Sequence, residues 1–216
     1  MQSDIDLTLD FHSHILPGCD HGSDSAKTSL KQIEMAKSAG IKTICATPHF
    51  YPHHENVDTF LKRRKQCFDC LKADLPADDP EIYLGAEVLI CDRLDCMDGL
   101  EKLCLEGTNL LLLEMPFSSW SDSIWDTLYM LLERNDIHVV MAHVDRYPAD
   151  NIESLIKDGV RMQINAESLM HPLKRRRLLK WIECGNVQYI GSDIHMLGDN
   201  YEYFEKSRRL IEKKFL

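Results

Sequence analysis

The sequence has no long hydrophobic run, and this absence sets the first limit on the class of protein. Its longest aliphatic run, from Leu110 to Leu113, is far too short to cross a bilayer. The first residues, from Met1 to Asp6, include acidic side chains and do not resemble a signal peptide. We therefore expect a cytoplasmic protein with no direct membrane insertion.

Several signature loops of enzymes are also missing. No cysteine is followed six positions later by arginine, so the phosphate-binding loop of thiol-dependent tyrosine phosphatases is absent. No two glycines are spaced as GxG, and no GxxxxGK sequence occurs, which argues against dinucleotide and P-loop nucleotide binding. Eight cysteines are scattered without a disulfide-like framework, as expected in a reducing compartment.

Basic residues are in the minority. There are 25 lysines and arginines against 35 aspartates and glutamates, which gives a formal net charge of −10 and argues against nucleic acid as the main partner. The basic residues form two runs, Lys62–Lys65 and Lys174–Arg177. We interpret both runs as solvated helix faces, with docking of an acidic partner as the alternative.

Apolar runs that favour strands alternate with amphipathic stretches along the whole chain. The predicted strands are Ile5–Phe11, Ile41–Thr47, Ile82–Val88, Asn109–Glu114, Ile137–Ala142, Val160–Asn165 and Val187–Gly191. The predicted helices are Ser25–Ser38, Val57–Lys72, Asp95–Cys104, Ser121–Arg134, Asn151–Lys157, Pro172–Cys184 and Tyr201–Phe215. This alternation predicts a parallel α/β sheet, closed or nearly closed into a barrel, in one domain over residues 1–216.

The first predicted strand ends in a potential metal-binding motif, Asp10-Phe11-His12-Ser13-His14. Side chains two residues apart on a strand point to the same side, so both imidazoles can reach one metal ion, and Asp10 is expected on that side too. An isolated HxH motif is a weak indication by itself.

Residue types that bind metals recur after further strands. In a parallel α/β barrel, residues that follow the carboxyl ends of the strands converge on one face. Any one of these side chains alone could be solvated or cap a helix, but their joint recurrence favours a metal centre. The candidate ligands are His12, His14, Asp20, His49, Glu87, Glu114, His143, Asp193 and His195.

These residues lie in motifs that resemble a known family. The motifs are Asp10-Phe-His-Ser-His-Ile-Leu-Pro-Gly18, Ala46-Thr-Pro-His49, Gly85-Ala-Glu87, Glu114, Ala142-His-Val-Asp-Arg-Tyr147 and Gly191-Ser-Asp-Ile-His195. Together they resemble the polymerase-and-histidinol-phosphatase (PHP) superfamily, most closely its manganese-dependent bacterial protein-tyrosine phosphatases of capsule and exopolysaccharide loci. The resemblance implies a distorted (β/α)7 barrel of PHP type with three divalent metal ions.

The resemblance also implies how the ligands are shared. His12, His14, Glu87 and Asp193 would hold the first ion, and Glu87, Glu114 and His143 the second. Asp20, His49 and His195 would hold the third. Manganese is expected, and iron or zinc would suit the same mixture of imidazoles and carboxylates. Four carboxylates with three divalent ions leave a local charge of about +2, which would attract a phosphate group.

The implied reaction is in-line attack of a metal hydroxide on phosphorus, without a phosphoenzyme. Arg146 is the candidate to clamp the phosphate, with a surface ion pair as the alternative. Asp20 or a metal-bound water is the candidate acid for the leaving group. An aromatic wall of Phe50, Tyr51, Phe117 and Trp120 and simple packing of these rings are equally compatible with the sequence. The arginine that the family often places after its last histidine is absent from Met196–Tyr201.

We therefore expect a phosphatase that acts on the tail of a tyrosine kinase, or another phosphotyrosine protein, in capsule or exopolysaccharide synthesis. One alternative is a phosphatase of small phosphomonoesters such as histidinol phosphate. Another is a catalytically silent metal-binding regulator. The nuclease role found elsewhere in the superfamily fits the acidic charge poorly. The sequence is compatible with an oligomer and does not specify one.

Overall fold

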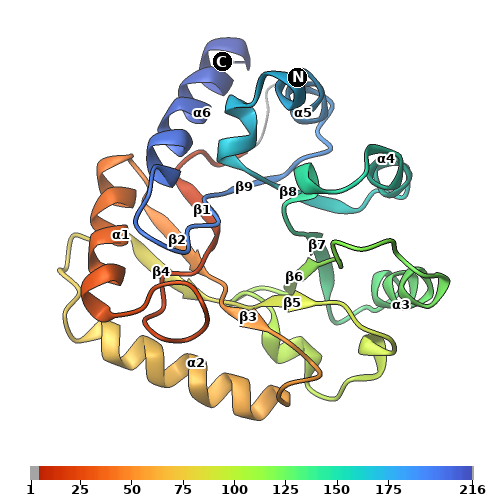
Figure 1. Cartoon of the computed structure of the whole chain (residues 1–216), viewed down its shortest axis with the longest axis horizontal. Coiled ribbons are helices and arrows are strands. Elements are labelled where there is room, and N and C mark those ends of the chain that lie inside the picture. Colours follow the sequence, from red (N-terminus) through yellow and green to blue (C-terminus); the bar gives the residue numbers. More distant parts are fainter. Residues whose placement is uncertain (1–4, 216) are drawn as a thin grey trace.

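Short parallel strands form the inner wall of the molecule, and α-helices surround them (Figure 1). The computed structural model describes residues 5–215, so the residues before Ile5, among them Asp4, lie outside the described part. The strands are β1 Leu9–Ser13, β2 Thr43–Ala46, β3 His49–Phe50, β4 Glu81–Leu84, β5 Glu87–Leu89, β6 Leu110–Glu114, β7 His138–Met141, β8 Arg161–Asn165 and β9 Tyr189–Gly191. The α-helices are α1 Ala26–Ser38, α2 Val57–Lys72, α3 Asp122–Leu132, α4 Ala149–Lys157, α5 Pro172–Glu183 and α6 Asn200–Phe215. Among residues 5–215, no helix is both long enough and apolar enough to span a membrane.

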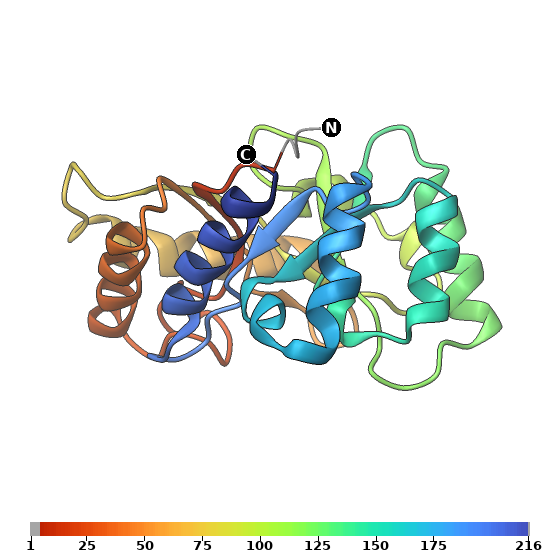
Figure 2. The same cartoon turned by 90° about the horizontal axis from the view of Figure 1, so that it is seen from above.

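The strands pair as two parallel sheets that curl into a barrel-like wall. One sheet has the order β1-β2-β4 and the other β3-β5-β6-β7-β8-β9. The last strand lies beside the first, because the amide of Asp193 donates to the carbonyl of His12 at 2.8 Å. The amide of His14 likewise donates to the carbonyl of Ile194 at 3.0 Å. Figure 2 shows the same wall from above, with helices along its outer side. The expected α/β barrel-like architecture is confirmed.

The number of strands differs from the prediction. The run Ile41–Thr47 forms β2, but the chain then passes Pro48 and pairs again as β3 in the other sheet. The predicted strand Ile82–Val88 is likewise divided into β4 and β5 at Gly85. Proline has no amide hydrogen for a ladder, and glycine allows close approach of a neighbouring chain. At Gly85, an added Cβ would lie 3.2 Å from Thr47 Cγ2. The two crossings lie side by side and place His49 opposite Glu87.

One predicted helix is also absent. The segment Asp95–Cys104 contains two short 3-10 turns, Leu94–Cys96 and Leu100–Leu103. Gly99 separates them with a φ of 78°, a left-handed conformation that ends regular helix. In contrast, the predicted helix Ser121–Arg134 forms as α3, and the side chain of Ser121 caps it by accepting a hydrogen bond from the amide of Ile124.

Alternation along the strands separates two apolar layers. Leu111 and Leu113 of β6 belong to the large core shared with the helices, whereas Leu112 belongs to a small cluster with Phe11 and Val140. The side chains that follow these apolar residues at the carboxyl ends of the strands are polar and buried. The fold therefore contains a layer of buried polar side chains at the carboxyl ends of the strands.

Candidate metal centre

His12 and His14 of the HxH motif point to the same place, as predicted. Their Nε2 atoms are 3.1 Å apart, and both rings are fully buried. The outer nitrogens have protein acceptors: His14 Nδ1 donates to Asp20 Oδ2 at 2.7 Å, and His12 Nδ1 lies 3.3 Å from Gln163 Oε1. Because the Nδ1 of each ring faces an acceptor of the protein, the Nε2 of each ring is the nitrogen left to bind a metal.

Asp10 does not join the two imidazoles, contrary to expectation. Its carboxylate accepts hydrogen bonds from the hydroxyl of Ser192 at 2.6 Å and from the hydroxyl of Tyr201 in α6 at 2.9 Å. The register between β1 and β2 shifts between Asp10 and Ser13, and such a bulge interrupts the alternation of side chains. Asp10 thus fixes β9 and α6 against β1.

Glu87 lies at the centre of the cluster and is 1% exposed. Its Oε2 is 3.2 Å from both His12 Nε2 and His14 Nε2, and 3.0 Å from His49 Nδ1. Its other oxygen, Oε1, is 2.8 Å from His143 Nε2. One carboxylate therefore faces imidazoles from three separate segments of the chain.

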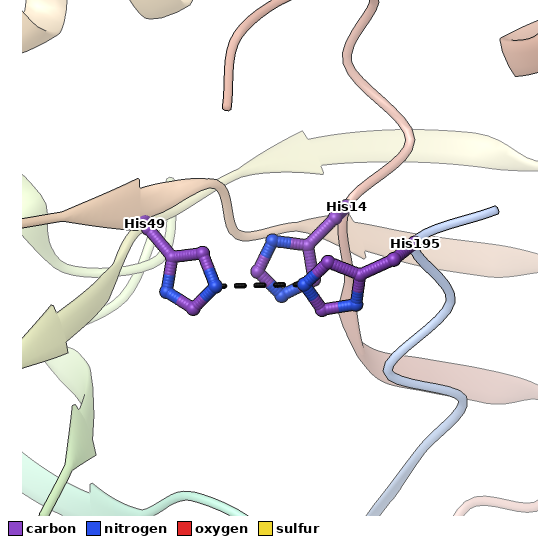
Figure 3. A group of neighbouring side chains, drawn as sticks. All are labelled: His14, His49 and His195. Carbon is purple, nitrogen blue, oxygen red and sulfur yellow. Dashed lines mark hydrogen bonds between the residues drawn. The ribbon is translucent and has the colours of Figure 1, made fainter. Parts of the chain in front are cut away.

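His49 and His195 complete a second group together with His14 (Figure 3). The Nε2 atoms of His49 and His195 face one another at 3.5 Å, and the Nδ1 of His195 lies 3.1 Å from its acceptor, the carbonyl of Asp193. In His195, as in His14, the Nδ1 is thus engaged by the protein, and the Nε2 faces the ring of a neighbouring histidine. Exposed His21 stacks on His49 with ring centroids 4.6 Å apart.

Glu114, His143 and Asp193 close the cluster from the ends of β6, β7 and β9. Glu114 Oε1 is 3.6 Å from His143 Nε2, and Asp193 Oδ1 is 3.5 Å from His14 Nε2. Both His143 and Asp193 have left-handed backbone, with φ of 31° and 51°. Positive φ is uncommon outside glycine and costs free energy that the surrounding structure must supply.

Several atoms in this cluster are buried without a hydrogen-bond partner. Within the described residues these include Glu87 Oε2 and His49 Nδ1. Leaving buried polar atoms unpaired is costly. A divalent cation would satisfy both groups at once, since imidazole and carboxylate are its usual ligands. The residues therefore fit a metal centre. Three groups of potential ligands have suitable spacing, namely His12/His14/Glu87, His49/Glu87/Glu114 and His14/His49/His195.

Asp20 lies beside the cluster, and its oxygens are already engaged. Besides the bond from His14, it accepts hydrogen bonds from the backbone amides of His49 and Gly22, both at 2.9 Å. Burial alone would raise the pKa of Asp20, but His14 and these amides outweigh burial and hold the pKa below its ordinary value. In this arrangement Asp20 orients His14, and its low pKa disfavours a role as proton donor.

Two further groups have pKa values that reflect crowding of the site. Burial, followed by the charge of Glu87, raises the pKa of Glu114 to about 7. Burial, followed by the charge of His14, lowers the pKa of His195 to about 4. His195 is therefore neutral at pH 7, the state in which an imidazole can bind a metal.

Arg146 reaches the cluster from the 3-10 turn after β7. Its Nη2 donates to Asp193 Oδ2 at 2.5 Å, and its side chain is 40% exposed. The guanidinium thus lies at the border between the buried cluster and solvent. A group at that border can meet an anionic substrate as it approaches the cluster.

The aromatic residues divide into two kinds. Phe50 is fully buried in the core, so it cannot form part of a wall facing substrate. Tyr51 stacks on His49 at 5.1 Å, and Phe117 lies parallel to His143 at 6.2 Å while remaining 72% exposed. Trp120 packs on Trp125 at 4.9 Å. Tyr51 and Phe117 therefore flank the cluster, whereas Trp120 mainly supports the loop after β6.

Sequence reasoning missed two buried amides of β8. Gln163 Oε1 accepts a hydrogen bond from the amide of His143 at 2.6 Å, and Asn165 Nδ2 donates to Asp193 Oδ2 at 2.8 Å. The available signal was the spacing of Gln163 and Asn165 two residues apart on one strand. The other histidines His53, His54, His138 and His171 are exposed and lie outside the cluster.

Comparison with known proteins identifies the family of this chain. Residues 8–216 match the model of the CpsB/CapC family, described as capsular polysaccharide synthesis. The chain belongs to this family.

Named relatives are distant but match over most of their length. The chain is 27% identical over 229 residues to the tyrosine-protein phosphatase CpsB of Streptococcus pneumoniae, covering 96% of this chain and 90% of the relative. It is 26% identical over 225 residues to the tyrosine-protein phosphatase YwqE of Bacillus subtilis strain 168, covering 96% and 85%. The fold matches a chain from the crystal structures of YwqE and CpsB with a TM-score of 0.79 at 23% identity. Those two proteins are described as unique metal-dependent tyrosine phosphatases. That match covers 96% of this chain and 87% of the solved chain.

Proposed function

We propose that this protein is a metal-dependent phosphatase that hydrolyses phosphotyrosine on a bacterial protein, such as the tail of a tyrosine kinase. The observation that carries the proposal is the set of inward-facing imidazole nitrogens around Glu87 Oε2, which has no hydrogen-bond partner among the described residues. Membership of the capsular polysaccharide family and the tyrosine phosphatases among its relatives supply the substrate class. We further propose a cytoplasmic location, and one catalytic domain over residues 1–216.

The proposed ligand sets follow the three parts of the cluster. His12, His14, Glu87 and Asp193 would hold one divalent ion, and Glu87, Glu114 and His143 a second. His49 and His195 would hold the third with Asp20, whose carboxylate turns toward His14 in this structure. When bound, manganese or a similar ion supplies positive charge for the phosphate and a water of lowered pKa.

The residues of the chain have separate tasks in this proposal. Arg146, already within hydrogen-bond distance of Asp193, would turn two N–H groups toward the phosphate oxygens. Phe117 and Tyr51 would flank the phenyl ring of the substrate, since both lie parallel to imidazoles of the cluster. Gln163 and Asp20 would hold the orientation of His12 and His14.

A comparison of substrates tests the proposal. Metal-loaded protein should hydrolyse a phosphotyrosine peptide with a kcat/KM at least about tenfold above that for histidinol phosphate, and excess EDTA should abolish both activities. An Asp193→Ala preparation, purified in parallel, controls for contaminating phosphatases. Turnover of the small ester alone would contradict the phosphotyrosine assignment. No turnover of either ester would favour the catalytically silent regulator.

A further inference from the structure

A groove on the outer flank of the barrel has no role in the proposed chemistry. It lies between α4 and α5, which are neighbours on the outside of the wall (Figure 1), and has a volume of about 600 Å³. Its lining combines cationic side chains with the apolar surfaces of Ile156, Leu173 and Trp181. Leu173 is 88% exposed, the largest exposure among the large hydrophobic side chains described.

The charge of this groove is opposite to that of the whole protein. Lys157, Arg176, Arg177 and Lys180 line it, and Glu153 is the one acidic residue among its lining residues. Within residues 5–215, none of the four cations forms an ion pair. Four unpaired cations on a chain of net charge −10 create a local site for an anion.

Arg177 gives independent evidence of a missing partner. Its guanidinium lies 5.1 Å from the ring centroid of Trp181, and its Nε is buried with no hydrogen-bond acceptor in the described protein. A buried N–H of a charged group is costly to leave unpaired, and carboxylate is the acceptor that matches a guanidinium best. The groove is therefore suited to carboxylates with aliphatic stems, which Leu173 and Trp181 can contact.

Most cations of the other basic run, Lys62–Lys65, are already engaged by other groups of the chain. On α2, Arg63 pairs with Glu55, Lys65 pairs with Asp69, and Arg64 donates to the carbonyl of Gly85 at 2.6 Å. These cations already have partners within the chain. The two basic runs therefore differ, and only the run on α5 keeps several unpaired charges beside a hollow.

A second hollow lies at the first turn of α5, and Asp145 and Glu167 are its acidic lining residues. It has a volume of about 400 Å³, and its lining includes Arg146, Pro172 and Lys174. Both hollows thus adjoin the first turn of α5, and Arg146 in turn contacts Asp193 of the cluster. A helix of 12 residues is about 18 Å long, which corresponds to roughly five or six residues of extended chain.

We propose that the groove between α4 and α5 binds an acidic segment of the protein substrate while its phosphotyrosine lies at the metal centre. This inference rests on the proposed function and adds that acidic residues several positions from the phosphotyrosine determine which protein is chosen. Charge on the rim of an interface acts mainly on association and specificity. We therefore expect the groove to lower KM for long substrates that carry an acidic segment.

The test compares two phosphotyrosine peptides of equal length, one with a flanking run of glutamates and one with glutamines in their place. The groove variant is Lys157→Gln/Arg176→Gln/Lys180→Gln, which changes three exposed side chains and leaves Arg177 on Trp181. The matched control is Lys62→Gln/Lys65→Gln/Lys72→Gln, which removes the same charge from exposed positions of α2. The ratio of kcat/KM for the acidic to the neutral peptide should fall about tenfold in the groove variant and stay unchanged in the control. In the wild type this ratio should also fall as NaCl is raised.

A binding measurement separates this inference from the proposed function. Fluorescence anisotropy of a labelled acidic peptide with unphosphorylated tyrosine, measured in EDTA, should give a Kd at least about fivefold lower for the wild type than for the groove variant. That result would stand even if no phosphate ester were hydrolysed. The inference would be overturned if the wild type and the groove variant had the same ratio of kcat/KM for the two peptides and the same Kd for the acidic peptide. A DNA oligonucleotide that binds the groove more tightly than the acidic peptide would overturn it too.

Discussion

The backbone of His143 and of Asp193 is left-handed, a conformation that costs free energy in residues other than glycine. Both residues have positive φ, and both point into the cluster around Glu87. Asn165 and Gln163 of β8 hold them in place through hydrogen bonds to the Asp193 carboxylate and the His143 amide. Strained residues that are fixed in this way are typical of functional sites.

Replacement of a single ligand should remove both metal and activity. His143→Ala should lower phosphatase kcat/KM by at least about a hundredfold and reduce the bound metal, because Glu87 and Glu114 then lose their shared imidazole. His138→Ala is the matched control, since His138 begins β7, the strand that His143 follows, and is exposed. Elemental analysis together with kinetics checks both effects, and a fully loaded, active His143→Ala protein would contradict the ligand assignment.

The effect of replacing Glu114 on the free energy of unfolding should depend on whether metal is present. Its pKa is raised from 4.5 to about 7, so in metal-free protein this carboxyl group destabilises the fold progressively as pH rises between those values. At pH 8 in EDTA, Glu114→Gln should therefore raise the free energy of unfolding by about 2–3 kcal/mol, and this gain should vanish near pH 4. With saturating Mn²⁺ at pH 8 the gain should be lost, because the ion reverses the local electrostatics. Urea unfolding under the four conditions measures the change, and a loss of stability in EDTA at pH 8 would contradict it.

At the scale of elements, the junction between β1 and β9 positions much of the cluster. His12 lies on one of these strands and Asp193 lies two residues after the other, and the Asp10 carboxylate accepts hydrogen bonds from Ser192 across them. Gly191 allows the close approach, because an added Cβ would lie 2.6 Å from His12 Cβ. The geometry of this junction therefore determines the geometry of the imidazoles.

Gly191→Ala should separate these two strands. The new methyl group would also lie 2.7 Å from Gln163 Nε2, so we expect a loss of about 1–3 kcal/mol in stability and at least about tenfold weaker metal binding. Gly198→Ala is the control, because the nearest neighbour of its added Cβ would be Asn200 Oδ1, at 3.4 Å. Thermal unfolding and metal titration measure the two effects, and similar behaviour of the two variants would count against this account of the junction.

The elements show how far the sequence could be read. The HxH spacing, and the His or Glu that follows several apolar runs, were enough to expect a barrel with polar residues at one mouth. The bulge in β1 that turns Asp10 away depends on contacts with Ser192 and Tyr201, far away in the chain. The crossing of the chain between sheets at Pro48 and Gly85 likewise depends on packing of two segments against each other. Periodicity within one segment cannot reveal either feature.

At the scale of the whole molecule, metal binding and folding should be coupled. The candidate ligands come from nearly every part of the chain, so an ion that binds them holds distant segments together in the folded state. Saturating Mn²⁺ should therefore raise Tm, with a contribution of about 2.7 kcal/mol for each site at a hundred times its Kd. Differential scanning calorimetry with Mn²⁺ and with EDTA measures this difference. An unchanged Tm would mean that the cluster does not hold the ion in the native state.

The bond between Asp10 and Ser192 joins residues 182 positions apart. His12 lies on the first strand of the described fold, His14 directly follows it, and Asp193 follows the last strand. No single segment of the chain can therefore form the cluster, and it is complete only when the two ends of the strand order have met.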